Sequence, residues 1–122
     1  TYGDHGTTYG GNPLVCSAVS IVHDIYEEDN ILANVKEVGQ YLWEKLEEIK
    51  NEYDCVVDHR GVGLIQGLEL SIPVGDFVKS CLDNGLVLIG AGNNTVRFVP
   101  PLIITKGNVD KAINVIIQTF RY

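Results

Sequence analysis

The chain is short and acidic. At 122 residues it has room for one domain, which at this size buries roughly two-thirds of the surface exposed by the unfolded chain. Sixteen acidic against nine basic residues give a formal net charge of −7, which argues against nucleic acid or an anionic membrane as a partner. No apolar run approaches the length that spans a bilayer, so we expect no membrane partner.

The first half of the chain is predicted to be helical. Asn12 as N-cap and Pro13 at the first helical position open one helix, which continues to an acidic break at residues 27–29. Asp29 or Asn30 is predicted to cap a second helix, whose charged face is solvated. Its apolar stripe has helical spacing: Ile31, Val35, Val38, Leu42, Leu46, Ile49 and Tyr53.

The second half is predicted to contain strands and helices in alternation. The expected strands are residues 55–57, 64–70, 86–89 and 96–99, with a glycine turn or bulge at 60–63. Asp76 is expected to cap a short helix with Phe77, Val78, Cys81 and Leu82 inward, and Thr105 to cap the last helix. The order helix, helix, strand, strand, helix, strand, strand, helix predicts an α+β domain, in which helices cover a small, mostly antiparallel sheet.

The three cysteines predict no disulfide framework and no metal site. Cys16, Cys55 and Cys81 are odd in number, far apart and set among apolar residues, and no Cys-x-x-Cys spacing occurs. We therefore expect buried free thiols in a reducing cytosol, and predict a cytoplasmic protein.

A loop rich in glycine and threonine precedes the first helix. Thr7 and Thr8 stand beside glycines, and hydroxyls next to unhindered backbone amides suit a phosphate. From the loop alone, ordinary loop threonines remain the more frequent alternative.

Three stretches resemble the class III aminotransferases of the ornithine and acetylornithine type, which use pyridoxal phosphate. They are residues 3–13 (GDHGTTYGGNP), 60–70 (RGVGLIQGLEL) and 94–102 (NTVRFVPPL), and they occur in the family's order. Asp4-His5 and Thr7-Thr8 are most similar to the acetylornithine type. The resemblance implies the small C-terminal domain of fold-type I enzymes, with residues 1–13 as a loop from the large-domain side and residues 14–122 as the small domain.

The resemblance also implies roles for three residues. Thr8, with Thr7 beside it, matches the threonine that donates to the cofactor phosphate of the neighbouring subunit. Arg97 matches the arginine that binds the α-carboxylate of glutamate or 2-oxoglutarate. A guanidinium in an apolar strand needs an anion, and its planar fork suits a carboxylate. The alternatives are an internal pair of Arg97 with Glu69 or Asp58, or a strand residue that points outward.

Parts of the expected chemistry lie outside this chain. Six lysines are present, on predicted polar helix faces or caps, and none resembles the family's Schiff-base lysine: Lys36, Lys45, Lys50, Lys79, Lys106 and Lys111. We therefore expect that lysine upstream, in an N-terminal cofactor domain of the same polypeptide. The chain would then be a C-terminal fragment, without a catalytic residue and inactive by itself.

The resemblance implies a homodimeric parent that acts on small molecules, transferring an amino group from N2-acetylornithine to 2-oxoglutarate in arginine biosynthesis. The alternatives are another class III aminotransferase (ornithine, succinylornithine or 4-aminobutyrate) or a stand-alone α+β binding or dimerisation module.

The remaining candidate residues receive structural roles. We expect Arg60 to anchor the glycine turn by bonding backbone carbonyls. His5, His23 and His59 share no spacing that would place them together, so a histidine-based hydrolase has little support. His5 is expected to order the threonine loop, and His23 to be half-exposed on its helix.

Overall fold

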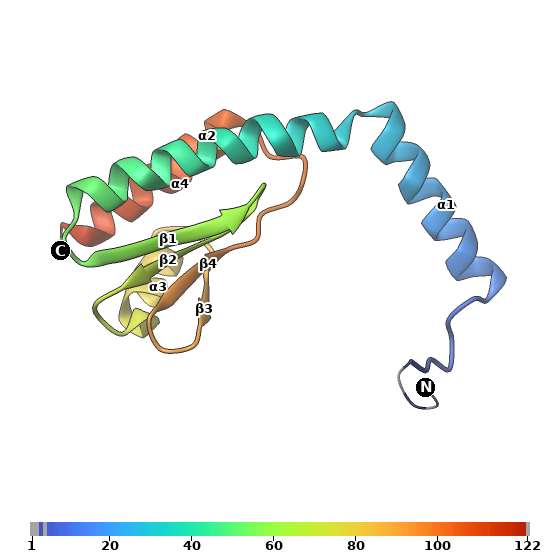
Figure 1. Ribbon diagram of the computed structural model, residues 1–122, viewed down its shortest axis with the longest axis horizontal. Helices are drawn as coiled ribbons and strands as arrows, with labels where there is room; N and C mark the ends of the chain where they lie inside the picture. Colours follow the sequence, from blue (N-terminus) through green and yellow to red (C-terminus); the bar gives the residue numbers. More distant parts are fainter. Residues whose placement is uncertain (1–2, 4, 122) are drawn as a thin grey trace. The chain divides into compact units, whose positions relative to one another are not determined.

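The fold is known from a computed structural model that describes residues 3 and 5–121, in the predicted order of elements (Figure 1). The chain divides into two compact units, Thr1–Leu32 and Ala33–Tyr122. The elements are α1 (Pro13–Glu28), α2 (Ile31–Glu52), β1 (Val56–Val62), β2 (Ile65–Leu70), α3 (Val74–Asp83), β3 (Ile89–Ala91), β4 (Thr95–Phe98) and α4 (Lys106–Phe120). The architecture is α+β, as predicted.

Helix α1 begins where the sequence predicts. The Asn12 side chain accepts a hydrogen bond from the backbone N–H of Val15 at 3.1 Å, and Pro13 occupies the first turn. No residue of α1 is buried, and Leu14 is 80% exposed. Cys16 is exposed as well, so the prediction of three buried thiols is wrong at this position. Asp29, a predicted cap of the second helix, is instead the C-cap of α1.

The four strands form one antiparallel sheet in the order β1-β2-β4-β3. Strand β1 runs on through the predicted glycine turn, because Gly61 pairs with Gln66 and Val62 pairs with Ile65. Gly63, with a φ of 58°, makes the turn together with Leu64. The predicted glycine turn is therefore confirmed at Gly63 and wrong for residues 60–62, which continue β1.

The predicted strand at residues 86–89 forms only at its last residue. Ile89 pairs with Arg97, and β3 extends to Ala91, two residues past the predicted end of the strand. The physical reason is the partner strand, since β4 ends at Phe98, ahead of Pro100 and its neighbouring proline. In the register of Ile89 with Arg97, residues 87 and 86 would lie opposite residues 99 and 100, which belong to no strand.

The core of the second unit lies between one face of the sheet and its three helices. Leu68, Leu70, Val96 and Phe98 point from the strands into a cluster with buried residues of α2, α3 and α4. Helices α2 and α4 run side by side over this face (Figure 1), where the Tyr41 hydroxyl donates to the Asp110 carboxylate at 2.6 Å.

Two features of the helices differ from the predictions. Helix α3 starts at Val74, so Asp76 lies in its first turn and is not the cap, and Leu82 is 55% exposed where an inward position was expected. Thr105 caps α4 as predicted, in a reciprocal capping box with Asn108.

A buried polar network ties α2 to the β1–β2 hairpin. The Gln66 side-chain amide donates to the carbonyls of Gly39 and Gly63 at 2.9 and 2.6 Å. This fixes its orientation, so its oxygen faces Nε2 of the buried His59 at 3.0 Å. The other ring nitrogen lies 2.7 Å from the Glu47 carboxylate. Both nitrogens of His59 therefore face oxygen acceptors.

The same hairpin touches α2 backbone to backbone. A Cβ atom added at Gly39 would lie 2.7 Å from the carbonyl carbon of Gly63, a distance that real Cβ contacts do not reach. Glycine at position 39 is therefore required for the helix to lie this close to the turn.

Candidate functional site

The threonine loop belongs to the first unit and ends at the start of α1. Thr7 Oγ1 accepts a hydrogen bond from the backbone N–H of Gly10 at 3.0 Å. A Cβ atom added at Gly10 would overlap the Thr7 methyl group, so a side chain at this position would displace the Thr7 side chain. The hydroxyl of Thr7 is thus engaged in shaping the loop.

The neighbouring Thr8 is placed differently. Thr8 is exposed, and its hydroxyl makes no hydrogen bond within the described part of the loop. His5 is exposed too, whereas Asp4, part of the motif on which the resemblance rests, lies outside the described residues. Among the described residues of the loop, the Thr7 hydroxyl thus has a partner and the Thr8 hydroxyl has none.

Arg97 belongs to the second unit, on β4, and points away from the core. Its neighbours Val96 and Phe98 are buried, while Arg97 itself is exposed. On this side of the sheet Arg97 lies between its cross-strand partners Gly67 on β2 and Ile89 on β3. The guanidinium therefore points outward and does not lie in the apolar setting that its neighbours suggested, and its role as a carboxylate contact stays a prediction.

We call this outward side of the sheet the open face. It is formed by side chains that alternate with the core residues along the four strands: Asp58, Arg60, Val62, Ile65, Gly67, Glu69, Ile89, Ala91, Thr95 and Arg97. The predicted carboxylate contact, Arg97, lies on this face.

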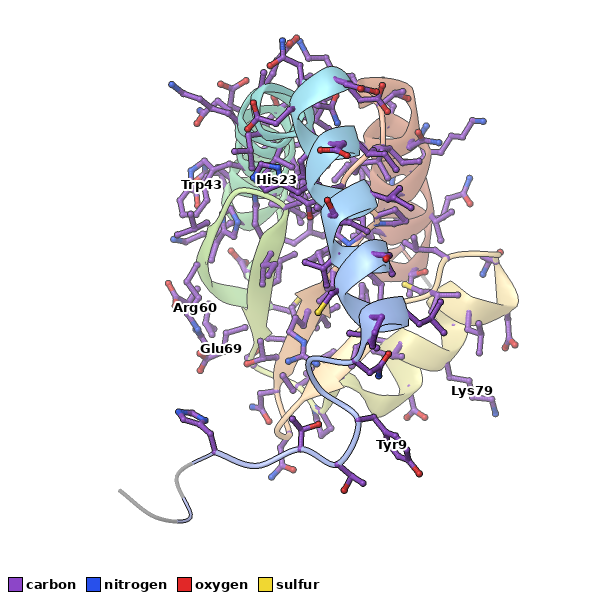
Figure 2. The ribbon with its side chains drawn as sticks, turned by 90° about the vertical axis from the view of Figure 1, so that its right-hand side faces the viewer. Tyr9, His23, Trp43, Arg60, Glu69 and Lys79 are labelled. Carbon is purple, nitrogen blue, oxygen red and sulfur yellow. The ribbon has the colours of Figure 1, made fainter. Side chains whose placement is uncertain are left out.

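Arg60 is at the centre of an ion-pair cluster on the open face. Its Nη1 lies 2.7 Å from Asp58 Oδ2 and 2.7 Å from Glu69 Oε2, and its Nη2 donates to Thr95 Oγ1 at 3.2 Å. Figure 2 shows Arg60 and Glu69 next to each other on the β1–β2 hairpin. The hydrogen bonds to Glu69 and then Asp58 raise the pKa of the Arg60 guanidinium, which in turn lowers the pKa of Asp58.

This cluster corrects two expectations. Arg60 bonds side chains across the strands and does not anchor a turn through backbone carbonyls. Glu69 and Asp58, the expected internal partners of Arg97, pair with Arg60 instead. Among the described residues, no carboxylate lies within 4.0 Å of the Arg97 guanidinium.

A hollow of about 300 Å³ lies between the two arginines. Its floor is Gly67, which is the cross-strand partner of both Arg60 and Arg97. The remaining lining comes from Gly61, Ile65, Gln66, Ala91 and Thr95. Of the two guanidinium groups that line the hollow, that of Arg97 has no carboxylate partner among the residues that the structure describes.

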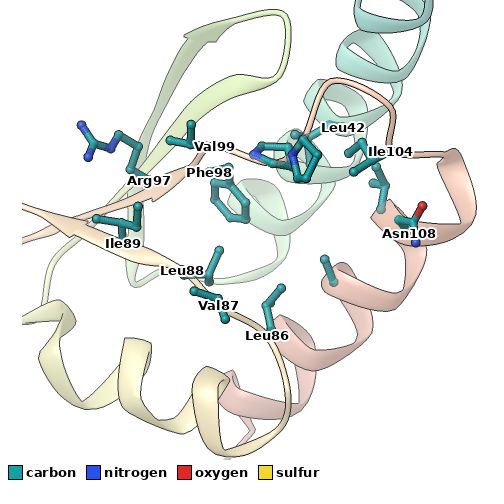
Figure 3. Close-up of a pocket in the computed structure, with 14 residues that line it drawn as sticks. Leu42, Leu86, Val87, Leu88, Ile89, Arg97, Phe98, Val99, Ile104 and Asn108 are labelled. Carbon is teal, nitrogen blue, oxygen red and sulfur yellow. The ribbon is translucent and has the colours of Figure 1, made fainter.

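A second pocket, of about 350 Å³, lies on the helix side of the same sheet edge. Its walls are mostly apolar and include Leu42, Leu86, Phe98, Pro101, Ile104 and Ala112. Figure 3 shows that the guanidinium of Arg97 points away from this pocket. Asn108, its one amide, is already engaged in the capping box of α4. The pocket thus has few polar groups with which to bind or transform a polar substrate.

The six lysines lie on helices α2, α3 and α4, and none lines either pocket. Lys45 pairs with Glu48 and Lys106 pairs with Glu37, each at 2.7 Å. His23 is exposed and not half-exposed as expected. Within residues 3 and 5–121 no helix is long and apolar enough to cross a membrane, and no cluster of three or more metal-ligating side chains occurs.

The family model of class III aminotransferases matches residues 1–120. The chain belongs to this family. Its members use pyridoxal phosphate, which agrees with the resemblance in the three motifs.

Individual relatives cover the whole chain but extend well beyond it. The acetylornithine aminotransferase of Clostridium acetobutylicum is 38% identical over 120 residues, which are 98% of this chain and 31% of that protein. The mitochondrial acetylornithine aminotransferase of Alnus glutinosa is 44% identical over 119 residues, 97% of this chain and 26% of the relative. The chain therefore spans about a third or less of the length of these relatives.

Solved structures match the same stretch. The ornithine aminotransferase of Plasmodium yoelii superposes with a TM-score of 0.88 at 31% identity, covering 99% of this chain and 33% of that one. The acetylornithine aminotransferase of Elizabethkingia anophelis gives a TM-score of 0.87 at 24% identity, over 99% and 31% of the two chains. The second likeness bears on the fold alone.

Two residues of the chain have the chemistry to bind groups that take part in the family's reaction, a cofactor phosphate and a substrate carboxylate. The exposed Thr8 hydroxyl, beside glycines and the start of α1, suits the oxygens of a phosphate. The Arg97 guanidinium suits a carboxylate. The described pockets offer no lysine that could hold the cofactor aldehyde.

Proposed function

We propose that this chain is the C-terminal part of a pyridoxal phosphate-dependent aminotransferase that transfers an amino group from N2-acetylornithine to 2-oxoglutarate in arginine biosynthesis. The family match supports the reaction class. Relatives named acetylornithine aminotransferase, at 35–44% identity, support the amino donor. In this proposal residues 1–13 form the loop from the large-domain side, residues 14–122 form the small domain, and the protein is cytoplasmic.

The observation that carries the proposal is the exposure of the Arg97 guanidinium. It is exposed above a hollow, and the nearby carboxylates of Glu69 and Asp58 are bound by another arginine. Its role is to bind the α-carboxylate of glutamate or 2-oxoglutarate through two parallel N–H···O bonds, which orient the substrate.

Thr8 has the second role, at the cofactor. Its hydroxyl donates to the cofactor phosphate of the neighbouring subunit, while Thr7 maintains the loop through its bond with Gly10. This role requires a homodimer, so each subunit would contribute its threonine to the site of its partner.

The cofactor, when bound, supplies the electron sink for amino-group transfer. The proton transfers and the covalent attachment need a lysine that this chain does not place in a pocket, so both fall to an N-terminal cofactor domain of the same polypeptide. The isolated chain is accordingly proposed to be inactive.

Kinetics of Arg97 variants in the full-length enzyme test the proposal. Arg97→Lys keeps the charge and loses the bidentate fork, so kcat/KM with 2-oxoglutarate should fall at least about ten-fold, a loss of roughly 1.4 kcal/mol in transition-state binding. Because Arg97 is exposed, Arg97→Lys and Arg97→Ala should leave thermal unfolding nearly unchanged. A large stability loss with unchanged efficiency in the folded variants would show that Arg97 belongs to the scaffold.

The likeness to an ornithine aminotransferase structure at 31% identity favours one further candidate, an enzyme with ornithine as amino donor. Comparison of kcat/KM for N2-acetylornithine and for ornithine distinguishes the two. A preference for ornithine would overturn the proposed donor and leave the reaction class intact.

A further inference from the structure

Glu69 stands in equivalent positions relative to two arginines on the open face. Arg60 on β1 and Arg97 on β4 are both cross-strand partners of Gly67, which lies between them on β2. Glu69 is two residues further along β2 and points to the same side. It is therefore the diagonal neighbour of both arginines, at a spacing of about 7–8 Å that long side chains bridge.

The structure shows which arginine Glu69 binds. Its carboxylate lies 2.7 Å from Nη1 of Arg60, which is also bound by Asp58 at 2.7 Å. The other arm of the Arg60 guanidinium extends over β2 to Thr95 on β4, at 3.2 Å. Arg60 is thus held at three points, and Glu69 binds Arg60 and not Arg97.

The Arg60 guanidinium, which reaches over β2 to Thr95, is the group that lies next to Glu69 on the side of the hollow. Gly67 forms the floor of the hollow, and Arg97 lines it. If Arg60 did not bind Glu69, the nearest cation on the same face would be Arg97. A carboxylate ligand would then have to displace Glu69 before it could bind Arg97.

We propose that Arg60 is a positioning residue, which keeps the Arg97 guanidinium available to a substrate carboxylate by holding Glu69. The inference rests on the proposed role of Arg97. According to this inference, the ion-pair cluster around Arg60 joins three strands and also raises the affinity of Arg97 for a carboxylate ligand.

The test uses the full-length enzyme with cofactor and two readouts. One is KM for 2-oxoglutarate, and the other is the inhibition constant of glutarate, an unreactive dicarboxylate that reports equilibrium binding. Arg60→Gln should raise both about two- to five-fold, the range expected for competition by one exposed ion pair. The change in kcat should be smaller, because saturating substrate displaces Glu69. High salt should shrink the effect.

Rescue by a second substitution separates positioning from a structural role. Arg60→Gln with Glu69→Gln should restore both constants to near the parent value, since the competing carboxylate is gone. The matched control is Arg60→Gln with Asp58→Asn, which removes the same charge from β1, two strands away from Arg97, and should not restore them. Arg60→Lys, which retains a cation for Glu69, should stay close to the parent.

The outcomes distinguish this inference from the function on which it rests. If Arg97→Lys weakens glutarate binding but Arg60→Gln does not, the inference fails and the proposed function stands. Equal rescue by both double variants, or rescue by neither, also overturns it, because the effect would then be bulk charge or misfolding. If Arg97→Lys leaves glutarate binding unchanged, both fail.

Discussion

Gln66 should contribute more to stability than any polar residue on the surface of the chain. It is 2% exposed and makes three hydrogen bonds, to the carbonyls of Gly39 and Gly63 and to the ring of His59. Gln66→Met keeps an unbranched side chain of similar length but removes all three bonds. The substitution therefore isolates the polar network from the packing of the core.

The expected loss can be estimated bond by bond. The His59 nitrogen would remain buried without an acceptor, a state that costs about 1–3 kcal/mol. The lost bond to the Gly63 carbonyl adds about 0.5–1.5 kcal/mol, while the Gly39 carbonyl lies within α2 and retains its place in the helix. Together these give roughly 1.5–4.5 kcal/mol. Each kcal/mol corresponds to a fall in Tm of about 4 °C in a chain of this size.

Urea denaturation of the 122-residue chain, followed by circular dichroism, measures this loss. Gln40→Met is the matched control, because Gln40 is exposed on α2 and makes one side-chain bond, to Glu44 at 3.0 Å. The control should change the free energy of unfolding by less than about 0.5 kcal/mol. The reasoning is refuted if Gln66→Met is no more destabilising than Gln40→Met.

Two further predictions concern the cofactor. In the full-length enzyme Thr8→Ala should weaken cofactor retention by roughly ten- to a hundred-fold, as expected for one charge-assisted hydrogen bond of about 1.5–3 kcal/mol, and Thr7→Ala should do less; equal effects on cofactor dissociation would remove Thr8 from the site. Incubation of this chain alone with pyridoxal phosphate, followed by borohydride reduction and mass spectrometry, should give no single stoichiometric lysine adduct, because no lysine lines a pocket. One specific adduct would contradict that expectation.

The helices could be predicted well because their signals are local. Asn12 caps α1 and Thr105 caps α4 through bonds to residues three positions along the chain, so neither depends on the tertiary fold. The apolar stripe of α2 likewise follows from its spacing, and its members Leu42, Leu46 and Ile49 are buried.

Strand limits and the candidate site depend on partners that a sequence does not reveal. The pairing of Gly61 with Gln66 extends β1 past a residue that, read alone, marks a turn. Arg97 could be predicted as a candidate from its motif. Which arginine Glu69 binds, however, depends on the register across three strands. The ion pair with Arg60 at 2.7 Å follows from that register. The same holds for His59, whose partners Glu47 and Gln66 lie on different elements.

The contact between Gly39 and Gly63 has a practical consequence for engineering this domain. Since the hairpin tip abuts the helix backbone, a tag or longer loop inserted at Gly63 has no room and would push β1 and β2 away from α2. The β3–β4 turn is the better place, because at Gly92 nothing lies within 4 Å of an added Cβ. Two turns of the same sheet thus differ sharply in their tolerance of insertions, and fluorescent or affinity labels belong at the second.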